Sequence, residues 1–246
     1  AEFREVPVSP AAWEPSALLQ FLEGRQAIPV LHGKDEILTL DGGPALVTNA
    51  ETLANAASVL RDGPDSQSED STGTKIVTLT GDIPHPYTVE VPLGTPVGVI
   101  VREIGGVSKI KAVQLGGLTG AWLSAGEPDI TISYETLPDG GEAAFFELIH
   151  VIADGKCAVE TAAGMMARLH GLSCGKCVLC REGTLHLWNL LDYLQKGEAQ
   201  PTDLDIMQEL GGSMKTGCVC AFGRTAAAPV LSALRLFTSE FEYHLK

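Results

Sequence analysis

Three cysteines recur at two-residue spacing in the run Cys174, Cys177 and Cys180, and Cys218 and Cys220 follow later in the chain. Thiolates at this spacing can converge on one small volume, which suits a soft metal centre. A cubane [4Fe–4S] cluster needs four thiolates, and the backbone N–H groups of a tight loop can hydrogen-bond its sulfides. The run therefore predicts an iron–sulfur site. Its fourth ligand is Cys218 or Cys220, and the spacing does not choose between them.

Zinc sites and disulfides are the alternative uses of these cysteines. Structural zinc usually takes paired CxxC knuckles or mixtures of cysteine and histidine, which a single CxxCxxC run does not resemble. Of the 6 cysteines, only Cys157 lies outside residues 174–220. Residues 1–4 carry no basic segment followed by an apolar core, so no secretory signal is expected. Clustered cysteines without such a signal favour metal ligation in a reducing compartment, and a cytoplasmic location is the default expectation.

The charge balance argues against one broad class of function. Lys and Arg together number 17 against 31 Asp and Glu, which gives a formal net charge of −14. Nucleic-acid binding depends on clustered cations that release counterions from phosphates, so a nucleic-acid partner is not expected. The sequence contains no apolar run approaching the roughly 20 residues that span a bilayer, so no transmembrane segment is expected.

Other catalytic motifs are not found in the sequence. It contains no phosphate loop of the G-x-x-x-x-G-K-[ST] type, and its glycine pairs are interpreted as turns. No Ser/His/Asp or Cys/His arrangement indicates a hydrolase. Arg181 and Lys176 could offset the negative charge of a thiolate-ligated cluster, or could be ordinary solvated side chains. Among the histidines, His186 lies next to the cysteine run, whereas His150 is expected to be a hydrogen-bonded core residue.

The segment that must position the cysteines is helical. From Cys157 onward, apolar residues recur at helical spacing. Four helices are predicted. The first has the apolar face Val159, Ala162, Ala163, Met166 and Leu169, and the second has Leu187, Leu190, Leu191 and Leu194 and ends at Gly197. The third covers residues 202–210, and the fourth has the apolar face Val230, Leu231, Leu234 and Phe237. Helices of this length joined by short loops predict a four-helix bundle over residues 157–246. Both cysteine segments fall between helices, so the bundle can bring them together.

The first part of the chain mixes strands and helices. Residues 1–63 are interpreted as the remnant of an α/β unit, with a short helix at 17–23 and a second helix that Asn49 caps and Gly63 ends. Residues 62–74 have no large apolar side chain and indicate a linker.

The middle of the chain predicts a sheet. Residues 75–117 contain strand, strand, helix and strand patterns typical of a small β-grasp-like insert. Residues 118–156 are expected to return to the α/β unit as strands at 130–134 and 145–152, the second of them buried on both faces. The predicted fold class is therefore α+β and multidomain.

Residues 173–184, S-C-G-K-C-V-L-C-R-E-G-T, resemble a known family pattern, S-C-G-x-C-x-P-C-R-x-G-T, with Leu179 in place of proline. The family is the NADH-binding flavoprotein subunit of respiratory complex I, with its relatives in NAD-dependent and electron-bifurcating hydrogenases and formate dehydrogenases. Its fourth cluster ligand precedes a glycine-bearing turn and an alanine-rich helix with a proline, which residues 220–231 match. The resemblance implies a ligand set for the [4Fe–4S] cluster: Cys174, Cys177, Cys180 and Cys220. Cys218 becomes a spare thiol.

The resemblance extends upstream. Residues 21–25, F-L-E-G-R, are similar to the family's S-L-E-G-R, and residues 47–53, V-T-N-A-E-T-L, are similar to its V-N-N-V-E-T-L. Residues 75–117 resemble its soluble-ligand-binding β-grasp insert. The family's flavin segments, G-R-G-G-x-G-F and N-A-D-E-G-E-P-G, do not occur in these residues. The resemblance therefore implies the cluster directly, whereas FMN and NAD are implied only by the family as a whole.

Three functions follow as hypotheses. The expected one is an iron–sulfur electron-transfer subunit of a multisubunit NADH-dehydrogenase-like oxidoreductase, which relays electrons through one [4Fe–4S] cluster and is not catalytic on its own. The second is a catalytic NADH:acceptor oxidoreductase subunit with FMN, and the third is a non-redox, zinc-bearing interaction module. By resemblance, the partners would be a thioredoxin-like [2Fe–2S] subunit and a larger multi-cluster or catalytic subunit, in the cytoplasm and peripheral to a membrane complex.

Overall fold

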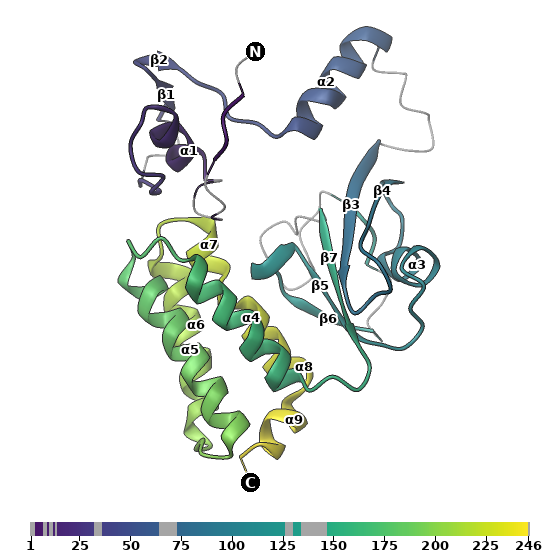
Figure 1. Cartoon of the computed structure of the whole chain (residues 1–246), viewed down its shortest axis with the longest axis vertical. Helices are drawn as coiled ribbons and strands as arrows, with labels where there is room; N and C mark the ends of the chain where they lie inside the picture. The colour runs from purple at the N-terminus through teal and green to yellow at the C-terminus, as the bar shows by residue number, and fades with distance from the viewer. Residues whose placement is uncertain are drawn as a thin grey trace. The chain divides into compact units, whose positions relative to one another are not determined.

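The chain forms two compact units in the computed structural model shown in Figure 1. The first unit combines Ala1–Val47 with Ala158–Lys246, and the second is Thr48–Cys157. The structure describes residues 3–6, 9, 12, 14–31, 36–63, 73–125, 130–133 and 147–245. None of the helices in these ranges has the length and apolarity that crossing a bilayer requires.

The cysteine-bearing part of the first unit is helical, as its sequence periodicity predicts (Figure 1). Its helices are α4 (Ala158–Leu172), α5 (Val178–Lys196), α6 (Thr202–Gly217), α7 (Ala221–Thr225), α8 (Ala228–Leu236) and α9 (Thr238–Tyr243). The buried side chains of α4 and α5 include most of the two predicted faces: Val159, Ala162, Ala163, Met166, Leu169, Leu187, Leu191 and Leu194. Leu190, the remaining predicted member, is only half-buried. Gly197 ends α5 in a left-handed conformation. The short helices α7 and α9, which flank α8, were not predicted.

Helix α6 is longer than its glycines suggest. The sequence predicts an end at residue 210, but the helix continues to Gly217. A Cβ atom on Gly211 would lie 2.6 Å from Leu231 Cδ1 and 3.1 Å from Ala227 Cβ. Glycine at this position therefore lets α8 pack closely against α6, and the packing of α8 outweighs the low helix propensity of glycine.

The N-terminal segment of the first unit contributes one helix and one small hairpin. Helix α1 (Pro15–Leu22) begins after Glu14, whose carboxylate accepts a hydrogen bond of 3.2 Å from the Ala17 N–H. Strands β1 (Thr39–Leu40) and β2 (Gly43–Pro44) pair in antiparallel fashion. The residues between α1 and β1 that the structure describes have no regular secondary structure.

The second unit is built on a mixed five-stranded sheet with strand order β4-β3-β7-β5-β6. The strands are β3 (Thr74–Gly81), β4 (Tyr87–Pro92), β5 (Ile110–Leu115), β6 (Trp122–Ser124) and β7 (Leu148–Ala153). The predicted helix at 95–104 is α3 (Val97–Val99) followed by a π-helical turn, η3 (Ile100–Ile104). A short 3-10 turn, η4 (Gly117–Thr119), follows β5. Apolar side chains from the sheet and from η3 form the core, among them Leu79, Ile100, Leu115, Ile149 and Val151.

Strand β7 differs from its predicted role. We expected this strand to return to a sheet begun by the N-terminal segment, but it is the central strand, parallel to β3 and antiparallel to β5. Ile149, Val151 and Ile152 are buried, so the strand is buried as predicted, but within the five-stranded sheet of the second unit. Of the predicted strand at 130–134, Thr131 forms one bridge to Pro96, and residue 134 lies outside the described ranges, as do 145 and 146. The β-grasp assignment and the four domain bounds stay predictions.

Helix α2 (Ala50–Asp62) begins at Asn49, whose side chain accepts the predicted capping bond, at 2.7 Å from the Thr52 N–H. Its first turn is anchored to β3 by an ion pair between Glu51 and Lys75. Glu51 also accepts a 2.7 Å hydrogen bond from the Ile76 N–H, and Lys75 is only 8% exposed. A buried ammonium needs a charged partner. The contacts of Glu51 with Lys75 and with the Ile76 N–H therefore connect α2 to the sheet.

The variant Glu51→Gln is expected to lower the free energy of unfolding of the second unit by about 1–3 kcal/mol at neutral pH, because it weakens a hydrogen-bonded, largely buried ion pair. Burial raises the pKa of the Glu51 carboxyl, but hydrogen bonds from Lys75 and the Ile76 N–H outweigh it and hold the pKa below its ordinary value of 4.5. The stability that this carboxylate contributes is therefore present above pH 4.5 and lost as the pH falls through the lowered value. Urea unfolding of both proteins across this range should show the difference vanish in acid. A difference that persists there would contradict the ionic explanation.

Candidate metal centre

Both cysteine segments lie where helices of the first unit begin or end. Helix α4 ends at Leu172, Cys177 is the N-cap of α5, and Cys180 lies in the first turn of α5. On the other segment, Cys218 follows the last residue of α6 and Cys220 is the N-cap of α7. Figure 1 shows α7 at the end of the bundle where α4 leads into α5.

Two glycines allow the segments to meet. A Cβ atom on Gly223 would lie 3.1 Å from Cys218 Sγ and 3.5 Å from Cys180 Cβ. A Cβ atom on Gly217 would lie 2.2 Å from Leu179 Cδ1, so the leucine that replaces the usual proline packs directly on the end of α6. The α6–α7 connection therefore lies against the start of α5.

The thiols influence one another electrostatically. Burial raises the pKa of the Cys180 thiol, a hydrogen bond from Ser173 opposes this, and Cys220, Cys174 and Cys177 raise it further. Burial likewise raises the pKa of Cys220, where the Gly223 N–H opposes it and Cys174 and Cys177 add to it. Burial and the neighbouring cysteines raise the pKa of Cys218 to about 12. Burial and the neighbouring thiols therefore disfavour the thiolate form of Cys180, Cys218 and Cys220, and a bound positive centre would offset that cost.

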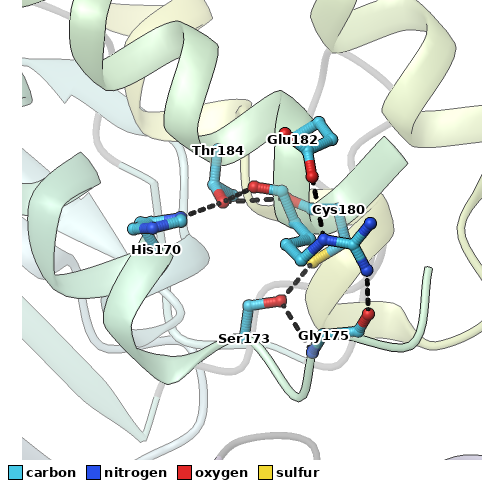
Figure 2. Close-up of polar contacts among 7 residues, drawn as sticks. His170, Ser173, Gly175, Cys180, Glu182 and Thr184 are labelled. Atoms are coloured by element: carbon cyan, nitrogen blue, oxygen red, sulfur yellow. Dashed lines mark hydrogen bonds and ion pairs between the residues drawn. The ribbon is translucent and has the colours of Figure 1, made fainter. Parts of the chain in front are cut away.

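The loop between α4 and α5 is held by its own polar groups (Figure 2). Ser173 Oγ lies 3.4 Å from Cys180 Sγ and accepts a 3.3 Å hydrogen bond from the Gly175 N–H. The Arg181 guanidinium donates a 2.6 Å hydrogen bond to the Gly175 carbonyl. Gly175 has φ +77°, a conformation that most other residues adopt only with strain. The Arg181 side chain thus stabilises the conformation of the loop at Gly175.

A second set of contacts orients the first turn of α5. Thr184 is fully buried, and its hydroxyl donates a 2.8 Å hydrogen bond to the Cys180 carbonyl. His170 Nδ1, from α4, lies 3.2 Å from the same hydroxyl (Figure 2). Sequence reasoning gave no role to Ser173, Thr184 or His170. The serine and the threonine belong to the quoted motif, which was a signal that could have found them.

The two histidines singled out from the sequence lie elsewhere. His186 lines a hollow of about 440 Å³ between α5 and α6, beside residues such as Leu190 and Glu209. It has no described contact with the cysteine loop. His150 lies in β7 with its Nδ1 3.1 Å from Thr80 Oγ1, so it is hydrogen-bonded as expected, but it is half-buried and not part of the core.

A comparison with protein-family profiles matches residues 160–244 to the NADH-ubiquinone oxidoreductase-F iron-sulfur binding region. The chain carries this F-type iron–sulfur region. It spans α4 to α9 and includes both cysteine segments, and it is a [4Fe–4S] region.

Relatives of the F-type region resemble nearly all of this chain. The NADP-reducing hydrogenase subunit HndC of Solidesulfovibrio fructosivorans is 32% identical over 243 residues, which are 94% of this chain and 49% of the relative. The F-type subunit of the NADH-quinone oxidoreductase of Streptomyces coelicolor is 30% identical over 240 residues, 94% of this chain and 54% of the relative. The chain therefore spans about half the length of these curated relatives.

A solved structure has the same fold. The crystal structure of an NAD+-reducing [NiFe]-hydrogenase in the H2-reduced state superposes with a TM-score of 0.84 at 26% identity, covering 97% of this chain and 42% of the hydrogenase chain. The mixed α/β architecture thus extends over both units of the present chain, and the relatives are subunits of redox assemblies.

The donor set of the F-type region fits an iron–sulfur cluster. Its cysteines are soft sulfur ligands, and Cys180 and Cys220 are buried while Cys174 and Cys177 are half-buried. A [4Fe–4S] cluster takes four such thiolates, which these two segments can supply.

Proposed function

We propose that this chain relays single electrons through one [4Fe–4S] cluster held by Cys174, Cys177, Cys180 and Cys220. The convergence of the two cysteine segments at one end of the helices carries the proposal. The Gly223 N–H acts to lower the pKa of the Cys220 thiol, against the effect of burial, and the resemblance to the family pattern supports a fourth ligand at this position. Cys218, packed against Gly223, is the spare thiol.

The bound cluster would supply reversible one-electron transfer, and the chain's own residues prepare its site. Cys180 and Cys220 are buried, whereas Cys174 and Cys177 are half-buried, so one side of the site is drier than the other. Ser173 Oγ lies 3.4 Å from Cys180 Sγ, and a hydroxyl that donates to a cluster thiolate would raise the cluster's reduction potential. Arg181 and Thr184 hold the loop and the first turn of α5 in place.

The proposed setting is a multisubunit NADH-dehydrogenase-like oxidoreductase, because the similar proteins are named as subunits of a hydrogenase and of NADH-quinone oxidoreductases. A thioredoxin-like [2Fe–2S] subunit and a larger multi-cluster or catalytic subunit would exchange electrons with this chain. The proposed location is cytoplasmic and peripheral to a larger complex. In this assignment the chain passes electrons between partners, and the substrates belong to the assembly.

Cofactor analysis of the purified full-length protein tests the proposal. We expect about four iron and about four acid-labile sulfide per chain, with an EPR signal that appears on reduction. Zinc without sulfide would refute electron transfer and support the zinc-bearing interaction module. One FMN per chain, reduced by NADH, would instead support the catalytic NADH:acceptor oxidoreductase.

A further inference from the structure

The cluster loop is tied to a distant part of the same unit. Lys176 lies between Cys174 and Cys177, and its Nζ donates a 2.7 Å hydrogen bond to the backbone carbonyl of Pro29, 147 residues away in the sequence. Pro29 is buried, although the residues around it form no helix or strand. The bond therefore joins the cysteine loop to an irregular segment that needs side-chain partners.

The backbone of residues 28–30 is hydrogen-bonded by side chains, not by the backbone partners of a helix or strand. Gln20 Nε2 donates a 2.8 Å hydrogen bond to the Ile28 carbonyl, and the Val30 N–H donates a 2.9 Å hydrogen bond to Ser16 Oγ. Both partners belong to α1, which therefore holds the segment from one side. Lys176, from the cysteine loop, donates to the Pro29 carbonyl, which lies between these two contacts in the sequence. Buried backbone carbonyls need such partners, so loss of the lysine would release the segment.

The position of the lysine is itself constrained. Gly175, its neighbour, is bound through its N–H to Ser173 and through its carbonyl to Arg181. The backbone of the loop is thus held on both sides of the peptide that precedes Lys176. Its ammonium group is bound to the Pro29 carbonyl, beside the hollow that Cys174 and Lys176 both line.

The tethered segment and the loop also border one hollow of about 760 Å³. Cys174, Gly175 and Lys176 line one part of it, and Gln20, Ile28 and Val30 line another. The bond from Lys176 to Pro29 connects these two sides. Cys174, a half-buried thiol, therefore borders the same hollow as residues 28 and 30.

We infer that Lys176 is a positioning residue for the cluster, an inference that rests on the proposed function. It holds residues 28–30 at the hollow that Cys174 lines, and it carries a positive charge within the loop, between two of the proposed ligands in the sequence. A fixed positive charge stabilises the reduced, more negative cluster, so it raises the reduction potential. The tether and the charge act through the same nitrogen atom.

The variant Lys176→Met tests the inference, because it removes the charge and the donor while keeping an unbranched side chain. We expect a more negative midpoint potential in an EPR-monitored redox titration of the full-length protein, and faster hydrogen exchange of the Val30 amide. Lys176→Arg, which keeps a charged donor, should restore both values toward wild type. Lys196→Met is the matched control: this lysine pairs with Asp192 at the far end of α5, about 28 Å from Cys177 by helix rise, and should change neither value.

An unchanged potential in Lys176→Met would overturn the inference, and so would faster exchange at Val30 with the potential unmoved, which is the result of a purely structural role. If the methionine variant loses its cluster during purification, Lys176→Gln keeps a polar donor without the charge, and its potential should shift in the same direction. A wild-type protein that binds no iron and sulfide would instead show that the proposed function itself is wrong.

Discussion

The variant Cys220→Ser is expected to abolish the [4Fe–4S] cluster, with iron and sulfide falling from about four of each per chain to background. Cys220 is buried at the start of α7, where the Gly223 N–H acts to lower the pKa of its thiol. Serine keeps the size of the side chain but replaces a soft thiolate with a hydroxyl, which is a poor ligand for this type of centre. Iron and sulfide analysis with EPR of the reduced protein measures the loss.

The variant Cys218→Ser is the matched control. Its side chain is as buried as that of Cys220 and lies only two residues away, but it packs against Gly223 in the proposed arrangement without binding iron. It should retain the cluster with an unchanged EPR signal. Equal loss of the cluster in both variants would contradict the ligand assignment, and loss in Cys218→Ser alone would exchange the roles of the two cysteines.

The variant Gly81→Ala is expected to lower the free energy of unfolding of the second unit by about 3–5 kcal/mol, the sum of backbone strain and a steric clash. Gly81 ends β3 with φ +95°, and a Cβ atom there would lie 2.2 Å from the Val151 carbonyl oxygen and 2.8 Å from the Val151 nitrogen. That carbonyl accepts a 2.9 Å hydrogen bond from the Asp82 N–H. Backbone atoms of the central strand β7 cannot move away without breaking the sheet.

Hydrogen exchange of the β3 and β7 amides in the full-length protein, combined with urea unfolding, measures this effect. Gly155→Ala separates its two causes, because Gly155 also has a positive φ, +88°, but a Cβ atom there would meet nothing within 4 Å. This control should cost only the conformational strain of about 1–2 kcal/mol. Equal destabilisation by the two variants would show that the contact with Val151 has no part in the effect.

Helices in both units could be predicted because their signals are local. Apolar residues at helical spacing marked the buried faces of α4 and α5, and Asn49 marked the start of α2 through a capping bond to Thr52. The end of α6 could not be predicted in the same way. Gly211 lowers helix propensity wherever it stands, and only its contact with Leu231 of α8 explains why the helix continues.

The position of β7 illustrates the same limit in the sheet. Its apolar run correctly predicted a buried strand, and Ile149 and Val151 are buried. The pattern contained no information on the neighbouring strands, since burial on both faces is satisfied in the centre of any sheet. Its pairing with β3 and β5 depends on contacts between residues far apart in the chain.

By itself, the sequence determined the chemistry of the centre and the type of its supporting elements. The spacing of Cys174, Cys177 and Cys180 is a local property, as is helical periodicity, so both can be recognised in the sequence without the three-dimensional structure. Only the tertiary structure decided what surrounds the cysteines. Gly223 against Cys180, Arg181 on the loop carbonyl and Lys176 on the Pro29 carbonyl are contacts that side-chain packing selects, and no local pattern specifies them.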